Sequence, residues 1–160
     1  MPVRPRRTIR VVLFGSEEMD YSGPAFAAAH QAEAEHFVVA SEADFGGDRA
    51  LQVQLPAGAA DTPLGRTLAE LLAPMRVILS REPALRAGDD LARLKATPFF
   101  SIRQDGTRYF DIHHSADDTL DKIDRRQLDQ IVATWAMAVY LAADSDLDFR
   151  AEPPRSTAQP

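Results

Sequence analysis

The chain has 160 residues, a length that suits one domain of ordinary size. Its composition, with 45% apolar and 26% charged side chains, is typical of a soluble globular protein and excludes an intrinsically disordered one. The net charge of −6 argues against nucleic acid or an anionic membrane surface as a partner, and the absence of cysteine excludes disulfides, thiolate metal sites and a cysteine nucleophile.

Apolar segments alternate with acidic ones in the first part of the chain. Residues 9–14 are apolar and rich in β-branched side chains, which predicts a buried strand, and an acidic segment follows directly. Residues 22–24 predict a helix start, and the Ala-rich stretch after them predicts a helix to about Ala34. Residues 36–40 predict a second strand, again followed by acidic side chains. This order is typical of α/β proteins, whose sites lie at the carboxyl ends of strands.

The middle of the chain predicts shorter elements. Residues 51–55 alternate apolar and polar side chains, as a half-exposed strand does. Thr62 or Pro63 should open a helix over residues 64–73. The buried face of this helix should carry three leucines, Leu68, Leu71 and Leu72.

Three further segments follow before the last helix. Residues 75–79 predict either a strand or the end of the preceding helical region, and residues 89–94 predict a short helix. The clearest later strand is predicted over residues 98–102. A turn is predicted at residues 104–107, which contain glycine and aspartate.

The strongest helix pattern covers residues 125–143, where apolar side chains recur at helical spacing. Trp135 lies on this apolar face and should belong to the core. Residues 151–160 are polar and rich in proline, which predicts a disordered tail after a domain at residues 1–150. Together the elements predict an α/β fold with a mixed, mostly parallel sheet and helices on both of its faces.

Residues 109–119 hold two adjacent histidines, His113 and His114, among acidic and hydroxyl side chains. Neutral imidazole is a common zinc ligand, and a nearby carboxylate usually fixes its tautomer. A solvated acidic turn without any ligand role is the alternative interpretation of this stretch.

Two other acidic segments follow predicted strands and suit the same chemistry. Glu17 and Glu18 follow the first strand, and Glu42 and Asp44 follow the second. With the histidine pair they offer oxygen and nitrogen ligands of the kind that zinc or manganese binds. Adjacent glutamates allow one carboxylate to bind a metal while the other accepts a proton from the activated water. The alternative is that the glutamates are solvated and the aspartate caps a turn.

Three segments of the sequence resemble the two-zinc aminopeptidases, a family that also includes glutamate-carboxypeptidase-like exopeptidases. They are residues 11–18 with the glutamate pair, the loop at residues 42–44, and residues 109–123 around the histidine pair. The resemblance extends over residues 7–143. It implies the carboxyl-terminal half of a zinc exopeptidase catalytic domain that removes residues from the N-terminus of peptides.

The resemblance implies a role for individual residues. Glu17 looks like the general base that deprotonates the bridging water. Glu18 and His114 look like ligands of one zinc, and Asp44 looks like a ligand of the second.

Several neighbouring residues are implied to act indirectly or not at all. Asp118 and Thr119 match the segment that braces the histidine loop, without contact to the metal. His113 is the less favoured ligand of the histidine pair, and His30 and His36 should be structural.

The sequence also departs from the family pattern. In the family an upstream half supplies a His-x-Asp segment whose aspartate bridges both metals, and this chain contains no His-x-Asp. Because a catalytic zinc normally has three protein ligands, we expect at most one weakly bound zinc and little or no activity from the isolated chain. Residues 86–90 match a loop that shapes the substrate pocket, but Arg86 and Lys95 make it more charged here, so substrate preference does not carry over.

Three functions remain open at this point. The first is a zinc exopeptidase that acts on peptides and is completed by a missing amino-terminal half. The second is a non-catalytic truncated remnant that self-associates, for example as a homo-oligomer, and holds at most one metal weakly. The third is an acidic module that binds calcium or magnesium.

The sequence carries no targeting signal within its printed length. No apolar run approaches the roughly 18 residues of a membrane span, and residues 1–10 lack the apolar core of a signal peptide. As printed, the chain should stay in the cytoplasm. Many relatives in the family are exported, so the native compartment stays open.

Overall fold

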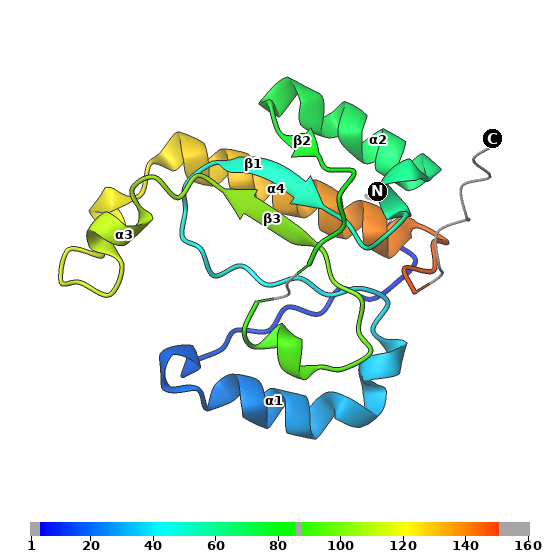
Figure 1. Ribbon diagram of the computed structural model, residues 1–160, viewed down its shortest axis with the longest axis horizontal. Helices are drawn as coiled ribbons and strands as arrows, with labels where there is room; N and C mark the ends of the chain where they lie inside the picture. The colour runs from blue at the N-terminus through cyan, green and yellow to red at the C-terminus, as the bar shows by residue number, and fades with distance from the viewer. Residues whose placement is uncertain (1–3, 86–87, 151–160) are drawn as a thin grey trace, which may run out of the picture.

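A computed structural model describes residues 4–85 and 88–150 of the chain. A small mixed sheet lies at its centre, with strand β1 (Ala50–Gln54) between β2 (Ile78–Leu79) and β3 (Ser101–Gln104). Figure 1 shows helix α4 (Arg125–Asp144) behind this sheet. The predicted tail at residues 151–160 lies outside the described residues.

The other helices surround the sheet (Figure 1). Helix α2 (Pro63–Leu72) packs against β2 and α4, whereas α1 (Ser22–His30) lies on the opposite side of the molecule. Helix α3 (Tyr109–Ile112) is a single turn. Short 3-10 helices complete the fold at Glu17–Met19, Gln31–His36, Ala59–Asp61, Ala73–Met75, Leu91–Arg93 and Leu120–Lys122. The predicted α/β fold, with a mixed sheet flanked by helices, is confirmed.

The strand register explains why β1 is the centre of the sheet. It pairs in parallel with β2, where Gln52 lies opposite Ile78, and antiparallel with β3, where Val53 lies opposite Ile102. Val53 is completely buried, because its side chain lies on the face of the sheet that packs against helices. The strand predicted over residues 51–55 is therefore confirmed within one residue.

Local capping signals define both long helices. Thr62 precedes Pro63, and its hydroxyl accepts a hydrogen bond from the Gly65 N–H at 3.3 Å. Asp124 accepts hydrogen bonds from the N–H groups of Arg126 and Gln127, each at 2.9 Å. Both predicted helices are confirmed, with observed bounds that differ from the predicted ones by one residue at an end.

The core lies between β1, α2 and α4. Leu68 and Leu72 of α2 are completely buried there, and Trp135 of α4 packs with its ring centroid 5.5 Å from that of Phe100. Leu71 was predicted to share this buried face, but 43% of it is exposed. At about 100° per residue, Leu71 lies about 60° from Leu68 and about 100° from Leu72, which places it at the edge of the buried face.

The strand predicted over residues 9–14 is wrong for the described structure. This segment forms neither helix nor strand, and Val11 and Leu13 are 79% and 90% exposed. A strand needs a neighbour for its backbone hydrogen bonds, and none of residues 4–85 and 88–150 pairs with it. Arg7 anchors its start, because its N–H donates to the Ala143 carbonyl at 2.9 Å.

The second predicted strand, over residues 36–40, is also largely wrong. His36 ends a 3-10 helix, and only Ala40 takes part in β-pairing, through an isolated parallel bridge to Phe99. The Ala40 N–H donates to the Pro98 carbonyl at 2.8 Å, and its carbonyl accepts from the Phe100 N–H at 3.0 Å. Apolar composition favoured an extended conformation, but a ladder requires a partner along the whole segment.

The remaining short elements match their predictions in part. The segment at residues 75–79 divides into a 3-10 turn ending at Met75 and the two-residue strand β2. The helix predicted over residues 89–94 is a single 3-10 turn, and the strand predicted at 98–102 lies at Ser101–Gln104. None of the helices in the described ranges is long and apolar enough to cross a membrane.

Candidate metal centre

The glutamate pair lies on a tight turn just after the unpaired segment at residues 9–14. Glu17 and Glu18 begin a 3-10 helix that ends at Met19, and the N–H of the following Asp20 donates to the Glu17 carbonyl at 2.7 Å. Glu17 is half-buried, whereas the Glu18 side chain is 69% exposed. The turn therefore places the two adjacent carboxylates in different environments.

His114 follows α3 and adopts an unusual backbone conformation. Its φ angle is +55°, in the left-handed region that few residues other than glycine occupy. Its Nε2 atom lies 2.9 Å from the carboxylate of Glu18. The structure thus brings together the two residues that the resemblance assigned to one zinc.

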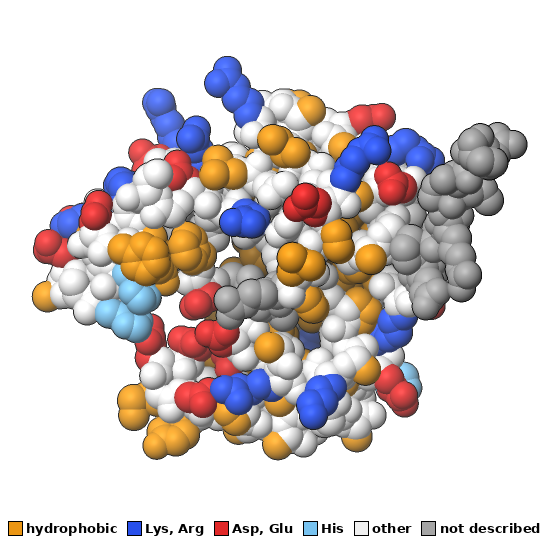
Figure 2. Space-filling model, viewed as in Figure 1, with side chains coloured by type: hydrophobic (Ala, Val, Ile, Leu, Met, Phe, Trp, Pro, Cys, Tyr) orange, Lys and Arg blue, Asp and Glu red, His pale blue; other side chains and the backbone are white. Residues whose placement is uncertain are grey.

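The other two predicted site residues share the electrostatic field of this pair. Burial raises the pKa of Glu17 above its ordinary value, and the carboxylates of Asp44 and Glu18 raise it further. Burial also raises the pKa of Tyr109, with the same two carboxylates as the next contributors. Figure 2 shows histidine side chains directly beside a group of acidic side chains on one face.

The bracing residues make local contacts within the histidine loop. The Asp118 N–H donates to the Ser115 carbonyl at 3.2 Å, and the Thr119 hydroxyl donates to Asp121 at 2.5 Å. Both Asp118 and Thr119 are exposed. These bonds shape the loop that follows His114.

Two further carboxylates lie near the site: Glu42, which the sequence offered as a metal ligand together with Asp44, and Asp90, to which it gave no role. Glu42 accepts a hydrogen bond from the Leu91 N–H at 2.9 Å, and Asp90 is only 5% exposed. Burial is the main cause that raises the pKa of each. The signal for Asp90 was present in the acidic segment at residues 88–90, although Arg86 and Ala87 of the same predicted loop lie outside the described residues.

An apolar groove runs beside these carboxylates. Its volume is about 740 Å³, and it is lined by residues that include Glu17, Asp44, Val12, Phe14 and Trp135. Carboxylates at an apolar groove resemble the usual composition of a ligand site, in which few polar groups accompany many apolar ones.

The remaining histidines lie apart from this pair, and their structural role stays a prediction. His30 contacts Glu33, and its ring packs against Phe26 with centroids 4.3 Å apart and planes inclined by 38°. His36 is exposed at the end of a 3-10 helix. Neither belongs to the contact between Glu18 and His114.

The spacing of Glu18 and His114 bears on whether the two side chains can hold one zinc ion. In a tetrahedral zinc site, two ligand atoms about 2.0–2.2 Å from the ion lie about 3.3–3.6 Å apart, so the 2.9 Å contact between Glu18 and His114 is a direct hydrogen bond that would have to open by about half an ångström to admit one zinc. Among residues 4–85 and 88–150, however, no group of three or more His, Asp or Glu side chains converges to hold a metal. A catalytic zinc takes three protein ligands, so this part of the chain does not form a complete site.

Comparison with known proteins identifies the origin of this arrangement. The model of peptidase family M28 matches residues 1–139, which is most of the chain. The chain belongs to peptidase family M28. The family predicted from the glutamate pair and the histidine loop is thereby confirmed, and M28 peptidases are generally zinc-dependent hydrolases.

Individual M28 relatives match nearly the whole chain. Carboxypeptidase Q from Rattus norvegicus is 28% identical over 145 residues, which are 90% of this chain and 31% of the relative. Carboxypeptidase Q from Bos taurus is 29% identical over 149 residues, 89% of this chain and 30% of the relative. The chain thus spans about a third of the length of these curated relatives.

A solved M28 structure supports the fold. The crystal structure of a peptidase M28 precursor from Shewanella amazonensis SB2B superposes with a TM-score of 0.86 and 37% sequence identity. The match covers 97% of this chain and 36% of that one. The fold described above is therefore an M28 fold over its described length.

Proposed function

We propose that this chain carries one part of the active site of a zinc-dependent exopeptidase. In this proposal Glu17 is the general base, Glu18 and His114 bind one zinc, and Asp44 binds a second. The contact between His114 Nε2 and the Glu18 carboxylate is the observation that carries the proposal. It joins two segments that are 96 positions apart in the chain.

The environment of Glu17 suits a proton acceptor. Burial and two neighbouring carboxylates raise its pKa toward the pH at which a general base works best. Glu17 would take a proton from the water that attacks the peptide carbonyl and pass it to the leaving amine. Zinc in such sites polarises the carbonyl and makes water more acidic.

The ligand set would be completed from outside the described residues. The family pattern places a His-x-Asp segment upstream, and the curated relatives are about three times as long as the match. We propose that this segment belongs to a further part of the same protein or to a separate chain. The isolated chain should then hydrolyse peptides slowly or not at all.

The end of the peptide that is cleaved is a separate part of the proposal. The sequence favours an aminopeptidase-type reaction, whereas the curated relatives bear the name carboxypeptidase Q. Three substrates separate the two reactions. They are a dipeptide with a blocked N-terminus, the same dipeptide with an amidated C-terminus, and the free dipeptide. Hydrolysis of the amidated substrate but not the N-blocked one supports the aminopeptidase reaction, and the reverse supports a carboxypeptidase.

The test uses this chain alone and mixed with the upstream part of the Shewanella amazonensis relative, each with added zinc. Turnover by the mixture that Glu17→Gln abolishes supports the proposal, while Glu35→Gln serves as the control at an exposed glutamate. Robust turnover by the chain alone would overturn the proposal that its zinc ligand set is incomplete. Turnover that is indifferent to Glu17→Gln would overturn the assigned base.

A second candidate is a self-associating, non-catalytic module. Its support is the exposure of Val11 and Leu13 on a segment without a β-partner among the described residues. Exposed apolar side chains next to unpaired backbone groups favour association with another chain. Zinc content far below one ion per chain, together with dimerisation, would favour this alternative.

A further inference from the structure

Four aromatic rings form a continuous column that ends at His114. Phe45 stacks on Tyr109 with centroids 4.0 Å apart and planes inclined by 11°. Tyr109 then lies 4.5 Å from His113, and His113 stacks on His114 at 3.8 Å and 18°. The column therefore connects the residue after Asp44 with the imidazole that contacts Glu18.

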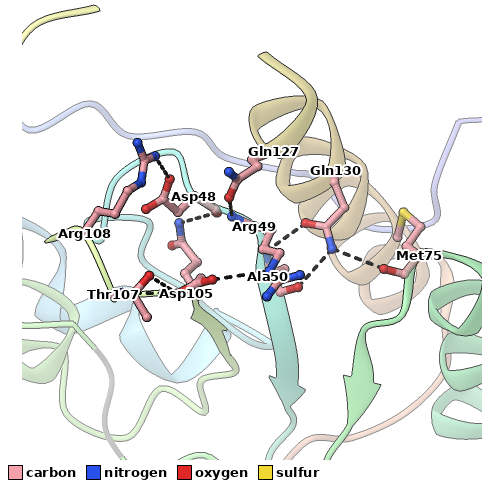
Figure 3. A network of polar contacts seen from close by, with 10 residues as sticks. Asp48, Arg49, Ala50, Met75, Asp105, Thr107, Arg108, Gln127 and Gln130 are labelled. Atoms are coloured by element: carbon pink, nitrogen blue, oxygen red, sulfur yellow. Dashed lines mark hydrogen bonds and ion pairs between the residues drawn. The ribbon is translucent and has the colours of Figure 1, made fainter. Parts of the chain in front are cut away.

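Polar contacts hold the first end of the column in place. Arg108 pairs with Asp48 at 2.6 Å, and the Gln104 side-chain amide donates to the carbonyls of Gly46 and Asp48 at 2.8 and 3.1 Å. Figure 3 shows Arg108 pointing to Asp48. Next to this pair, the side-chain oxygen of Gln127 in α4 accepts a hydrogen bond from the Arg49 N–H. The loop after Asp44 is thus fastened to the segment that leads into α3.

Space for the Phe45 ring depends on a glycine. A Cβ atom at Gly106 would lie 2.9 Å from Cε1 of Phe45, too close for an unshifted ring. Phe45 itself remains 38% exposed and belongs to neither core cluster. A large apolar ring that the core does not use, and for which the chain leaves room, points to a positioning role.

The far end of the column is the part that needs support. His114 holds a left-handed backbone conformation, which is unfavourable for a residue other than glycine. Its contact with Glu18 is exposed on both sides, and exposed ion pairs are weak by themselves. The ring stack with His113 and the contact with Glu18 meet at the same imidazole, whose Nε2 faces Glu18.

We propose that Phe45 is a positioning residue, which acts through Tyr109 and His113 to hold the His114 imidazole against Glu18. The proposal deepens the proposed function. It rests on that function in so far as it treats Glu18 and His114 as zinc ligands. Within the chain itself it concerns only the orientation of the His114 ring against Glu18.

The first measurement uses metal-free protein. In Phe45→Ala, the ring protons of His113 and His114 should shift, and the nuclear Overhauser contact between His114 and the Glu18 side chain should weaken. Phe45→Tyr should restore both signals because it restores the ring. Phe110→Ala is the matched control, since Phe110 is 80% exposed and meets both Tyr109 and His113 edge-on, outside the stack.

The second measurement is zinc affinity by titration. Phe45→Ala should weaken zinc binding about tenfold, the effect typical of groups that orient a ligand. Phe45→Tyr should return the affinity to within about twofold, and the melting temperature should change little in each variant. Unchanged His114 signals in Phe45→Ala, or equal changes in Phe110→Ala, would overturn the positioning role. If the chain binds no zinc even when the upstream part completes it, the proposed function fails, and the metal-free spectra alone decide the role of Phe45.

Discussion

The Nε2 atom of His114 lies 2.9 Å from the Glu18 carboxylate, although the two residues are 96 positions apart. Glu18 lies on a 3-10 turn and His114 follows a one-turn helix, so neither is held by a long regular element. The contact depends instead on how the two loops pack.

Removal of the imidazole should reveal whether this pair binds metal. His114→Ala deletes one of the two donors that meet, so zinc affinity should fall by more than about tenfold. Titration with zinc, or with cobalt followed by its visible absorption, measures the loss. His36→Ala removes an exposed histidine elsewhere and should leave the affinity unchanged. Equal affinity in His114→Ala and wild type would remove His114 from the ligand set.

Neutralising Glu17 should stabilise the fold at neutral pH. Because folding raises the pKa of Glu17 above 4.5, the folded state binds this proton more tightly than the unfolded state does. The favourable contribution is therefore complete below about pH 4.5 and is lost as the pH rises through the folded pKa. Glu17→Gln should melt at a higher temperature than wild type near pH 7.5, with the difference vanishing in acid.

Thermal unfolding at a series of pH values measures this effect. Glu35→Gln, at an exposed glutamate, should change the melting temperature little at any pH. A Glu17→Gln variant that is less stable than wild type at neutral pH would show that the charged carboxylate is favourably bound. Gain of stability together with loss of turnover in the completed enzyme is the usual mark of a functional residue.

The two leucines on α2 should respond differently to truncation. Leu68 is completely buried, so Leu68→Ala should lower the free energy of unfolding by about 2–5 kcal/mol through lost burial and a cavity. Leu71 is 43% exposed on the same helix, so Leu71→Ala should lower the free energy of unfolding by only about 0.5 kcal/mol. Urea denaturation measures both. Similar losses for the two variants would contradict the packing of α2.

Polar substitution in the unpaired segment should reduce self-association. Val11 and Leu13 are 79% and 90% exposed, so Val11→Ser with Leu13→Ser removes apolar surface that only a partner could cover. Sedimentation velocity over a range of concentrations should show a weaker dimer, or none, with no loss of stability in the monomer. Leu120→Ser, at a residue 85% exposed elsewhere, is the control. Association that both variants lower equally would not depend on this segment.

The helices were predictable from the sequence because their signals are local. Thr62 and Asp124 cap their helices through hydrogen bonds to N–H groups no more than three residues away, and apolar spacing marks the buried faces. The type of each site residue, and through it the family, was also readable from Glu17, Glu18 and the histidine pair. These features need no knowledge of distant parts of the chain.

The predicted strands depended on information that the sequence does not hold locally. Residues 9–14 have the composition of a strand, but strand formation requires a neighbour to accept and donate hydrogen bonds, and the described residues provide none. Residues 36–40 meet a partner only at Ala40. Apolar composition therefore predicted that these segments tend to be extended, but it did not predict whether another strand pairs with them.

By itself, the sequence determined the α/β class, the two long helices and the residue types of an M28 site, because periodicity, caps and motifs act over a few positions. Only the tertiary structure decided that Glu18 meets His114, that Glu17 is half-buried beside Asp44, and that a column from Phe45 ends at His114. Each of these relationships joins loops far apart in the chain. Their geometry follows from packing across the fold, which no local pattern encodes.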